Sequence, residues 1–255
     1  MHKYKKSLGQ HFIHDSNIID KIIKYIKPNK SDIFLEIGPG DGALSLPLST
    51  IIKNLILIEK DSTLISELNL LLKSSSKSIK IINGDILKIK IEDYLIDNLR
   101  VVGNLPYNIS TEILFKFSHL DKSIEDLHFM LQKEVVDRIV AKPKTKQYGR
   151  LSVMCQTYFS VENLFDISPN VFFPKPKVWS SYIRLVPKRN IFMNKTHENK
   201  FNFIVNASFI ARRKMIKSSL KNLVDLKKLS HVIGDITVRP EELHSEDFIE
   251  IARHV

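Results

Sequence analysis

The sequence predicts an α/β protein with a mostly parallel sheet that helices cover on both faces, followed by a small all-helical domain. Over roughly the first 160 residues, apolar runs of strand length alternate with stretches of helical periodicity, a pattern typical of such sheets. Beyond residue 188 only short helical patterns remain. We therefore expect one domain over residues 1–188 and a second, helical domain over residues 189–255.

The individual elements follow from local patterns. Isoleucines recur on one helical face between residues 18 and 26, and Pro28 with Asn29 ends that helix. A buried strand is expected at 33–37, and a Gly-Pro-Gly turn then leads into a helix that begins near Ala43. Residues 178–186 alternate as an antiparallel edge strand does. The remaining core strands are expected at 55–58, 79–82, 100–103 and 127–131, and the C-terminal helices at 201–209, 212–223, 226–233 and 245–252.

The composition is that of a basic globular protein. Its 255 residues, of which 43% are hydrophobic, are enough to bury a full core. No apolar segment has the length needed to cross a bilayer and no signal peptide is evident, so we expect a cytoplasmic location. Cys155 is the only cysteine, which excludes an intrachain disulfide and a thiolate-rich metal site. The net charge of +11 favours a polyanionic partner, either nucleic acid or an anionic membrane surface.

Three strand ends together indicate a cofactor crevice. Glu36–Gly42 places glycines directly after the first core strand, where they let a ligand approach the backbone. Glu59 closes the second strand and can accept both hydroxyls of a ribose, and Asp85 closes the third and can accept from an adenine amine. The G-x-G-x-G spacing differs from that of dinucleotide enzymes, which argues against an NAD-dependent oxidoreductase. Each feature alone is compatible with a turn, a solvated strand end or a helix N-cap, whereas their order and spacing favour one site.

The segment Asn104-Leu105-Pro106-Tyr107 follows the fourth strand and predicts the chemical centre. The side-chain carbonyl of Asn104 and the backbone carbonyl of Leu105 can accept the two hydrogens of an adenine amine, and Pro106 restricts the second carbonyl's direction. Such contacts would turn the nitrogen lone pair toward an electrophilic methyl group, so positioning and electrostatics supply the catalysis. Tyr107 can stack on the base. The structural alternative is a plain turn after a buried strand.

Several segments together resemble the ribosomal-RNA adenine N6-dimethyltransferases, namely residues 6–12, 36–42, 103–107, 148–152 and 172–178. Arg212-Arg213-Lys214 with Ser219-Leu220 resembles the C-terminal helix of the branch that acts on the small subunit. The resemblance, which runs from about residue 5 to the C-terminus, implies a Rossmann-like class I methyltransferase that uses S-adenosyl-L-methionine. Its expected reaction is N6,N6-dimethylation of two adjacent adenines in the 3′-terminal hairpin loop of small-subunit (16S) rRNA, with a role in small-subunit biogenesis.

The resemblance also implies roles for single residues. Phe172 would sandwich the target adenine against Tyr107, although paired aromatic residues such as Phe172 and Phe173 are more often part of a core. No metal is implied, the expected partner is small-subunit rRNA in the immature 30S subunit, and a monomer is expected. Lys144 stands where the family commonly has Gly, and Met215 where Thr is common, so the local turns and RNA contacts could differ. The cofactor pocket would be lined by His11, Ile13, Gly38, Gly40, Glu59, Asp85, Ile86 and Asn104.

Basic clusters predict an RNA-binding surface. One comprises Lys3, Lys5 and Lys6, and residues 212–221 place five more cations within three turns of one expected helix. A single charged run is most often a solvated helix face, but the clusters together account for much of the excess charge. The residues singled out for RNA contacts are Lys144, Lys146, Arg150, Arg212, Arg213, Lys214 and Lys217.

The sequence is also compatible with two alternative functions on the same fold. A resistance-type dimethyltransferase would act on large-subunit rRNA with the same chemistry, and the segment 212–220 argues against it. A non-catalytic ribosome assembly factor could use the same fold, and the intact Asn104 and Tyr107 argue against it.

Overall fold

The computed structural model describes residues 9–73, 78–94, 96–118, 120 and 123–254. The chain forms two compact units, one of Met1–Val136 with Glu162–Pro187 and the other of Asp137–Val161 with Lys188–Val255. The domain boundary expected at residue 188 stays a prediction; the compact units join residues 137–161 to the C-terminal part. The basic cluster of Lys3, Lys5 and Lys6 lies outside the described residues.

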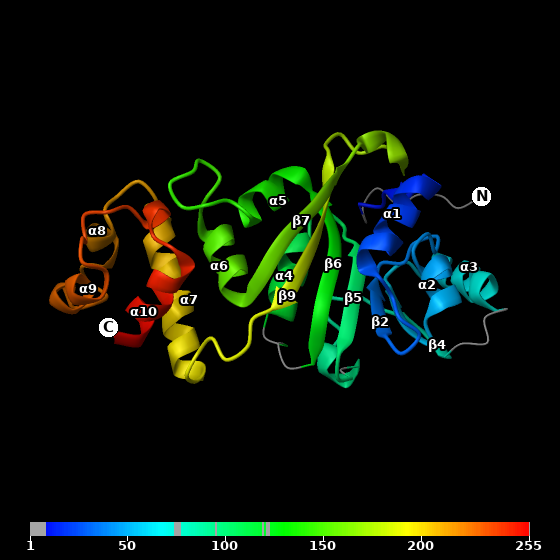
Figure 1. Cartoon of the computed structure of the whole chain (residues 1–255), viewed down its shortest axis with the longest axis horizontal. Helices are drawn as coiled ribbons and strands as arrows, with labels where there is room; N and C mark the ends of the chain where they lie inside the picture. The colour runs from blue at the N-terminus through cyan, green and yellow to red at the C-terminus, as the bar shows by residue number, and fades with distance from the viewer. Residues whose placement is uncertain (1–8, 74–77, 95, 119, 121–122, 255) are drawn as a thin grey trace. The chain divides into compact units, whose positions relative to one another are not determined.

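Within the described residues the main sheet has seven strands in the order β4-β3-β2-β5-β6-β9-β7 (Figure 1). The strands from β4 to β6 in this order pair in parallel, and β9 pairs antiparallel with β6. The mostly parallel sheet that the sequence predicts is therefore confirmed. The strand bounds are β2 Ile33–Ile37, β3 Asn54–Glu59, β4 Ser78–Asn83, β5 Leu99–Asn104, β6 Ile124–Gln132, β7 Phe159–Ile167 and β9 Ser180–Pro187.

Helices connect the parallel strands, and Figure 1 shows α1 in front of the sheet and α4 behind it. α1 begins where the Asp15 side chain accepts hydrogen bonds from two backbone N–H groups, and it ends at Lys27, whose φ of 50° stops the helix just before the predicted Pro28. The bounds are α1 Ser16–Ile26, α2 Ser45–Ile51, α3 Ser62–Leu72, α4 Ser110–Phe117, α5 Lys133–Ile139 and α6 Arg150–Tyr158, with a 3-10 turn at Ile91–Tyr94.

The strand predicted at 178–186 is antiparallel as expected, but the prediction that it forms the sheet edge is wrong. β9 lies between β6 and β7, so that β7 occupies the edge. The sequence analysis missed β7 because most of its residues are exposed or half-buried and form no continuous apolar run. It also missed a two-stranded sheet in which β1 (Phe12–Ile13) pairs antiparallel with β8 (Phe172–Phe173).

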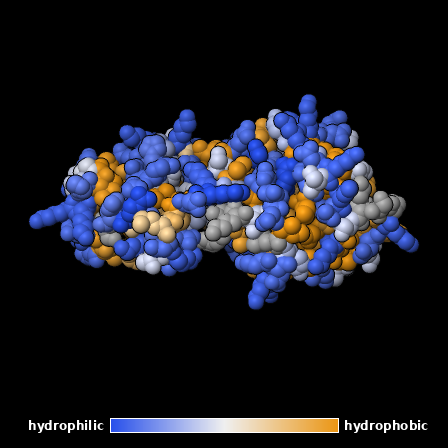
Figure 2. Space-filling model, turned by 60° about the horizontal axis from the view of Figure 1, so that its bottom comes forward, coloured by the Kyte–Doolittle hydropathy of each residue, from blue (hydrophilic) through white to orange (hydrophobic). Residues whose placement is uncertain are grey.

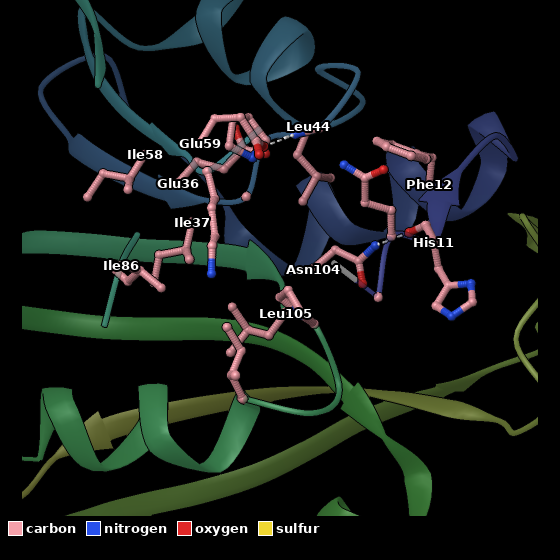
Figure 3. Close-up of a pocket in the computed structure, with 18 of the residues that line it drawn as sticks. His11, Phe12, Glu36, Ile37, Leu44, Ile58, Glu59, Ile86, Asn104 and Leu105 are labelled. Atoms are coloured by element: carbon pink, nitrogen blue, oxygen red, sulfur yellow. Dashed lines mark hydrogen bonds between the residues drawn. The ribbon is translucent and has the colours of Figure 1, made fainter. Parts of the chain in front are cut away.

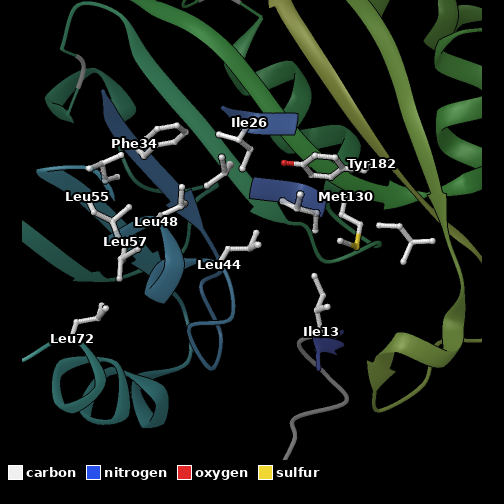
Figure 4. Close-up of a cluster of buried hydrophobic side chains, with 14 of the residues drawn as sticks. Ile13, Ile26, Phe34, Leu44, Leu48, Leu55, Leu57, Leu72, Met130 and Tyr182 are labelled. Atoms are coloured by element: carbon white, nitrogen blue, oxygen red, sulfur yellow. The ribbon is translucent and has the colours of Figure 1, made fainter. Parts of the chain in front are cut away.

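A cluster of buried apolar side chains joins the sheet to α1 and α2 and positions the strand ends (Figure 4). Ile22 and Ile26 come from the apolar face of α1 that the sequence predicts. The remaining members shown in the figure include Ile13, Phe34, Leu44, Leu48, Leu55, Leu57, Leu72, Met130 and Tyr182. This packing fixes the carboxyl ends of the strands relative to the segment that precedes α1.

A charged network lies in the same interior. Arg100 on β5 donates to both carboxylate oxygens of the buried Asp126 on β6, at 2.8 and 3.0 Å, and to Asp32 at 2.8 Å. It also donates to the backbone carbonyl of Ile26 at the end of α1. His128 and Arg184 donate to Asp126 as well. Burial raises the pKa of Asp126, but the hydrogen bonds from His128 and Arg100 outweigh it and hold this pKa well below its usual range. Asp126 is therefore the anion on which three cationic or polar side chains converge.

The C-terminal unit is helical, as the sequence predicts. This unit, Asp137–Val161 with Lys188–Val255, contains α6 and also α7 Lys195–Ile210, α8 Ile216–Leu220, α9 Leu226–Ile233 and α10 Ser245–His254. The helix expected over 212–223 is wrong in extent, because residues 211–213 form a turn and only 216–220 are helical. Met215 has an extended conformation, and the backbone N–H groups of Ile216 and Lys217 donate to carbonyls of residues 238 and 236. Tertiary hydrogen bonds thus replace the first helical turn.

Candidate active site

One pocket opens at the carboxyl ends of the strands and brings the predicted cofactor residues together (Figure 3). It is lined by the segment before α1, the turn after β2, and the ends of β3, β4 and β5. Every residue that the sequence analysis expected at the cofactor or in the chemical segment, except Phe172, lines it: His11, Ile13, Gly38, Gly40, Glu59, Asp85, Ile86, Asn104, Leu105, Pro106 and Tyr107. Sequence positions almost 100 residues apart therefore meet in one cavity.

The glycine turn and Glu59 form one hydrogen-bonded unit. The Gly40 N–H donates to one carboxylate oxygen of Glu59 at 3.1 Å, and the Asp61 N–H donates to the other at 2.7 Å. Glu59 is only 6% exposed, and this burial raises its pKa while the backbone donors oppose the rise. The alternative of a solvated strand end does not match this geometry. Each carboxylate oxygen retains a second lone pair that can accept from a ligand hydroxyl.

Gly38 forms the open part of the same turn. Its φ of +64° lies in the left-handed region, and a Cβ added there would meet no heavy atom within 4 Å. The position therefore leaves empty space in the pocket wall where any other residue would place a strained side chain. Gly40 also has positive φ, and a Cβ there would lie 2.5 Å from the Phe12 ring.

Glu36 lines the pocket, although its sequence position alone had not marked it as a functional candidate. Its side chain is 2% exposed and accepts a hydrogen bond of 2.5 Å from the Ser45 hydroxyl. Burial is the main cause that raises its pKa to about 8, and Glu59 and Asp41 add repulsion. Burial likewise raises the pKa of Asp41, which also lines the pocket. The available signal was an acid inside the otherwise apolar strand 33–37.

Asp85 follows β4 and stays ionised in the pocket wall. Lys60 donates to it at 2.9 Å, and this hydrogen bond is the main cause that lowers the pKa of Asp85. The Leu87 N–H donates to its other oxygen at 3.0 Å, so Asp85 also closes a turn. The turn-capping interpretation and the role as an acceptor for a ligand are thus compatible in one residue.

The segment Asn104–Tyr107 is held from two sides. The Asn104 amide nitrogen donates to the backbone carbonyl of His11 at 2.6 Å, as Figure 3 shows. The Tyr107 hydroxyl shares a hydrogen bond of 2.6 Å with the buried Ser180 hydroxyl of β9, and burial raises the Tyr107 pKa. The His11 ring stacks on the Tyr107 ring with centroids 5.6 Å apart. His11 therefore supports the chemical segment through both its backbone and its side chain.

Phe172 lies elsewhere. Its side chain is 4% exposed, belongs to the apolar cluster of Figure 4, and is not among the described residues that line the pocket. Its register partner in the small sheet is Ile13, whereas the neighbouring Phe173 is 54% exposed. The proposed stacking of Phe172 on a substrate base remains a prediction, and its environment is that of a core residue.

The seven residues singled out for RNA contacts all lie in the C-terminal unit, and most of them are exposed. Lys144 has a φ of +67°, the left-handed conformation that Gly adopts readily, and its N–H donates to the Glu241 carbonyl. Arg212 forms an ion pair with Glu241 and donates to the Lys146 carbonyl. Its charge is therefore partly neutralised, and it braces the Lys144 loop. The other expected contacts, which are exposed or half-buried, are Lys146, Arg150, Arg213, Lys214 and Lys217.

Figure 2 shows hydrophilic residues over most of the face that it presents, with hydrophobic residues exposed between them. No helix within the described residues is long and apolar enough to cross a membrane. The same residues contain no group of three or more His, Cys, Asp or Glu side chains placed to hold a metal ion.

A mostly parallel sheet with a glycine turn after its first core strand, an acid at the end of the next and Asn-Leu-Pro-Tyr after the fourth defines a class I methyltransferase. The family model described as ribosomal RNA adenine dimethylase matches residues 1–253. The chain belongs to this family.

Relatives over nearly the full length support the assignment. A protein of Nitrosococcus oceani named "Ribosomal RNA small subunit methyltransferase A" is 41% identical over 255 residues, which cover 99% of this chain and 96% of the relative. A protein of Coxiella burnetii with the same name is 42% identical and covers 97% and 96%. The crystal structure of a dimethyladenosine transferase from Plasmodium falciparum has a TM-score of 0.83 at 25% identity and covers 94% and 95%.

Proposed function

We propose that this protein uses S-adenosyl-L-methionine to convert two adjacent adenines in the 3′-terminal hairpin loop of small-subunit rRNA to N6,N6-dimethyladenosines. The names of the relatives at about 40% identity support the choice of the small subunit. The observation that carries the chemistry is the hydrogen bond from the Asn104 side-chain nitrogen to the His11 carbonyl, because it leaves the side-chain oxygen as the group available to a substrate amine.

The pocket fits the proposed cofactor. Glu59 retains acceptor capacity for ribose hydroxyls, the Gly38 position leaves space for a ligand against the backbone, and Asp85 can accept from an adenine amine. Asp41 and Glu59 also line the pocket, and their carboxylates favour a cationic ligand when they are ionised. When bound, the cofactor supplies an electrophilic methyl group on a sulfonium. The residues that would hold it are His11, Ile13, Gly38, Gly40, Glu59, Asp85, Ile86 and Asn104.

The chain's own residues position the acceptor nitrogen. The Asn104 Oδ1 and the Leu105 carbonyl accept the two hydrogens of the adenine amine and favour a pyramidal nitrogen with its lone pair directed at the methyl donor. Pro106 restricts Leu105 to extended conformations, which limits the direction of that carbonyl. Because His11 stacks against Tyr107, the target base stacks on the other face of the Tyr107 ring. Phe172 is the further aromatic residue proposed from family resemblance.

The basic residues of the C-terminal unit supply phosphate contacts that choose the substrate. The exposed cations Lys144, Lys146, Arg150, Arg213 and Lys214 and the half-buried Lys217 carry this role, and Arg212 supports the loop that presents two of them. The proposed partner is the immature 30S subunit in the cytoplasm, with a part in small-subunit biogenesis. The proposed enzyme acts as a monomer and needs no metal.

Methyl transfer with labelled S-adenosyl-L-methionine tests this function. Small subunits that lack the modification should receive label as dimethyladenosine, and Asn104→Ala should lower the transfer at least about a hundredfold, within the range of a lost electrostatic contact. Binding of the RNA should persist in this variant. Label in large-subunit RNA alone would indicate the resistance-type enzyme, and RNA binding without any transfer would indicate an assembly factor.

A further inference from the structure

The loop between β8 and β9 exposes apolar and basic side chains in alternation. Phe173 is 54% exposed and Trp179 is 52% exposed, and Val178 beside the tryptophan is exposed as well. Lys175 and Lys177 between them are also exposed, and neither forms an ion pair with a carboxylate of the described residues. We refer to residues 173–179 as the stacking loop.

The stacking loop adjoins the chemical segment. Trp179 immediately precedes Ser180, whose hydroxyl bonds the Tyr107 hydroxyl at 2.6 Å. The Trp179 carbonyl accepts from the Lys133 N–H at 2.9 Å, and the register of β9 against β6 begins beside it with Ser180 opposite Gln132. These bonds fix the backbone of Trp179 at the end of the sheet where the parallel strands finish and where Asn104 and Tyr107 lie. One peptide unit, about 3.8 Å between Cα atoms, separates Trp179 from the residue that holds Tyr107.

Packing within the described residues does not account for the exposed Trp179 ring, whereas Phe173 contacts the His14 ring. Single exposed apolar residues are common on protein surfaces and would carry no inference alone. Here Phe173, Val178 and Trp179 are exposed within seven residues, on a loop whose two lysines are unpaired within the described chain. The Trp179 indole nitrogen has no hydrogen-bond partner among the residues that the structure describes. Aromatic rings alternating with cations are the arrangement that binds single-stranded nucleic acid, because every base has a face that stacks.

We propose that the stacking loop binds the nucleotides adjacent to the target adenine, with Trp179 stacking on an unpaired base and Lys175 and Lys177 contacting the flanking phosphates. This inference rests on the proposed function and adds a substrate-positioning surface to it. An adenine that enters the pocket leaves its neighbours in the RNA loop without a stacking partner. Trp179 lies next to Ser180, which holds Tyr107, and its ring takes the place of the lost stacking partner. It thereby holds the RNA strand at the pocket entrance.

The chain offers a direct probe, because Trp179 is its only tryptophan. Intrinsic tryptophan fluorescence of the full-length protein therefore reports on this ring alone. Titration with a hairpin RNA whose loop contains two adjacent adenines should quench the emission. The same hairpin with abasic nucleotides on both sides of the adenines should bind with little quenching. Unchanged emission at saturating hairpin RNA, with binding shown independently by anisotropy of labelled RNA, would overturn the proposal.

Kinetics provide the second test. Trp179→Ala should raise the KM for the hairpin RNA about fivefold or more, the low end for loss of one stacked base, and change kcat less. Trp179→Phe should recover most of the affinity because the ring is retained. Phe203→Ala, which removes an equally exposed ring (55%) from α7, serves as the matched control and should leave the KM unchanged. The melting temperature and cofactor affinity of Trp179→Ala should match those of the wild type.

These measurements separate the inference from the proposed function. If the wild type methylates the adenines and Trp179→Ala has the wild-type KM, the stacking surface is refuted and the function stands. If Trp179→Ala impairs methylation of the assembled subunit but not of the naked hairpin, the loop contacts a ribosomal protein and the RNA proposal is refuted. If the wild type transfers no methyl group to any rRNA, the proposed function itself fails.

Discussion

The side-chain nitrogen of Asn104 donates a hydrogen bond of 2.6 Å to the backbone carbonyl of His11, a residue 93 positions earlier in the chain. A carbonyl can only accept, so the amide orientation of Asn104 is determined: its nitrogen faces His11, and its oxygen remains available as an acceptor. The segment before α1 thus sets the orientation of the Asn104 amide in the proposed chemical centre. Asn104 and His11 form one unit in which a backbone group orients a side chain.

Replacement of this amide by a carboxylate tests the orientation. Asn104→Asp places an acceptor oxygen opposite the His11 carbonyl, so we expect a loss of about 1–3 kcal/mol in the free energy of unfolding at pH 8. Methyl transfer should fall at least about tenfold. Urea unfolding and single-turnover transfer measure the two effects. If Asn104→Asp is as stable as the wild type at pH 8, the hydrogen bond does not constrain Asn104.

The buried acid in the pocket makes stability depend on pH. The pKa of Glu36 is about 8 in the folded protein against an ordinary value of 4.5, so the folded state binds more protons between these values. The contribution of Glu36 to the free energy of unfolding is complete below pH 4.5 and is lost as the pH rises through 8. Glu36→Gln keeps an acceptor for Ser45 and removes the titration. Between pH 5 and pH 9, the free energy of unfolding of Glu36→Gln in urea should rise by more than about 1 kcal/mol relative to that of the wild type. Parallel pH profiles of the two proteins would contradict the assignment.

The interior network around Asp126 should be sensitive to removal of one partner. Asp126→Ala leaves the guanidinium of Arg100 buried without its main counterion, and we expect it to cost about 3–5 kcal/mol in urea unfolding at pH 7. The double variant Arg100→Met with Asp126→Leu should be less destabilised than Asp126→Ala, since the charges that it leaves without these partners, on Asp32 and Arg184, are partly exposed. Equal destabilisation of the two variants would mean that Arg100 is not stabilised chiefly by Asp126.

Lys144 occupies a conformation that suits glycine. With φ at +67°, any residue with a Cβ is strained there, so Lys144→Gly should be roughly 1 kcal/mol more stable than Lys144→Ala. The two variants lose the same charge, and the comparison therefore isolates the backbone. Thermal unfolding measures the difference, and identical melting temperatures would show that the turn relaxes around the side chain.

Adjacent arginines should behave differently in RNA binding. Arg213 is exposed, so Arg213→Ala should weaken binding and reduce the slope of log K against log salt by about one. Arg212 is engaged with Glu241 and the Lys146 carbonyl, so Arg212→Ala should change this slope less and lower the unfolding free energy by up to about 1 kcal/mol. Salt titrations by anisotropy measure the slopes. Equal slopes for the two variants would contradict the distinction.

The parts of the fold that sequence predicts are those with a local signal. The apolar run at 33–37 matches β2 at both ends, and Leu226–Ile233 matches α9, because burial or amphipathic periodicity is continuous there. β7 lacks such a run, and β1 and β8 are two residues each, so no periodicity reveals them. The helix predicted over 212–223 is shorter in the structure, where the N–H groups of Ile216 and Lys217 donate to carbonyls of residues 238 and 236 that no local pattern reveals.

The residues of the candidate site likewise divide into those that a local sequence pattern predicts and those whose contacts no local pattern reveals. Glycines, Glu59 and Asn104 were predictable because strand ends of a parallel sheet meet at one edge. Glu36 was readable as an acid inside an apolar strand but was not considered functional. The pairing of Arg212 with Glu241 and the support of Tyr107 by Ser180 depend on contacts across 29 and 73 residues, which no local pattern encodes.

The two-residue pairing of β1 with β8 joins His11, which lines the pocket and precedes β1, to the stacking loop, which begins in β8. Because the two strands are paired, a ligand that shifts one of them also shifts the backbone partner of the other. Thermodynamic linkage then requires reciprocity: whatever factor RNA contributes to cofactor affinity, the cofactor contributes equally to RNA affinity. The small sheet is thus a direct backbone connection between the pocket and the loop at its entrance, and any coupling that it carries acts equally in both directions.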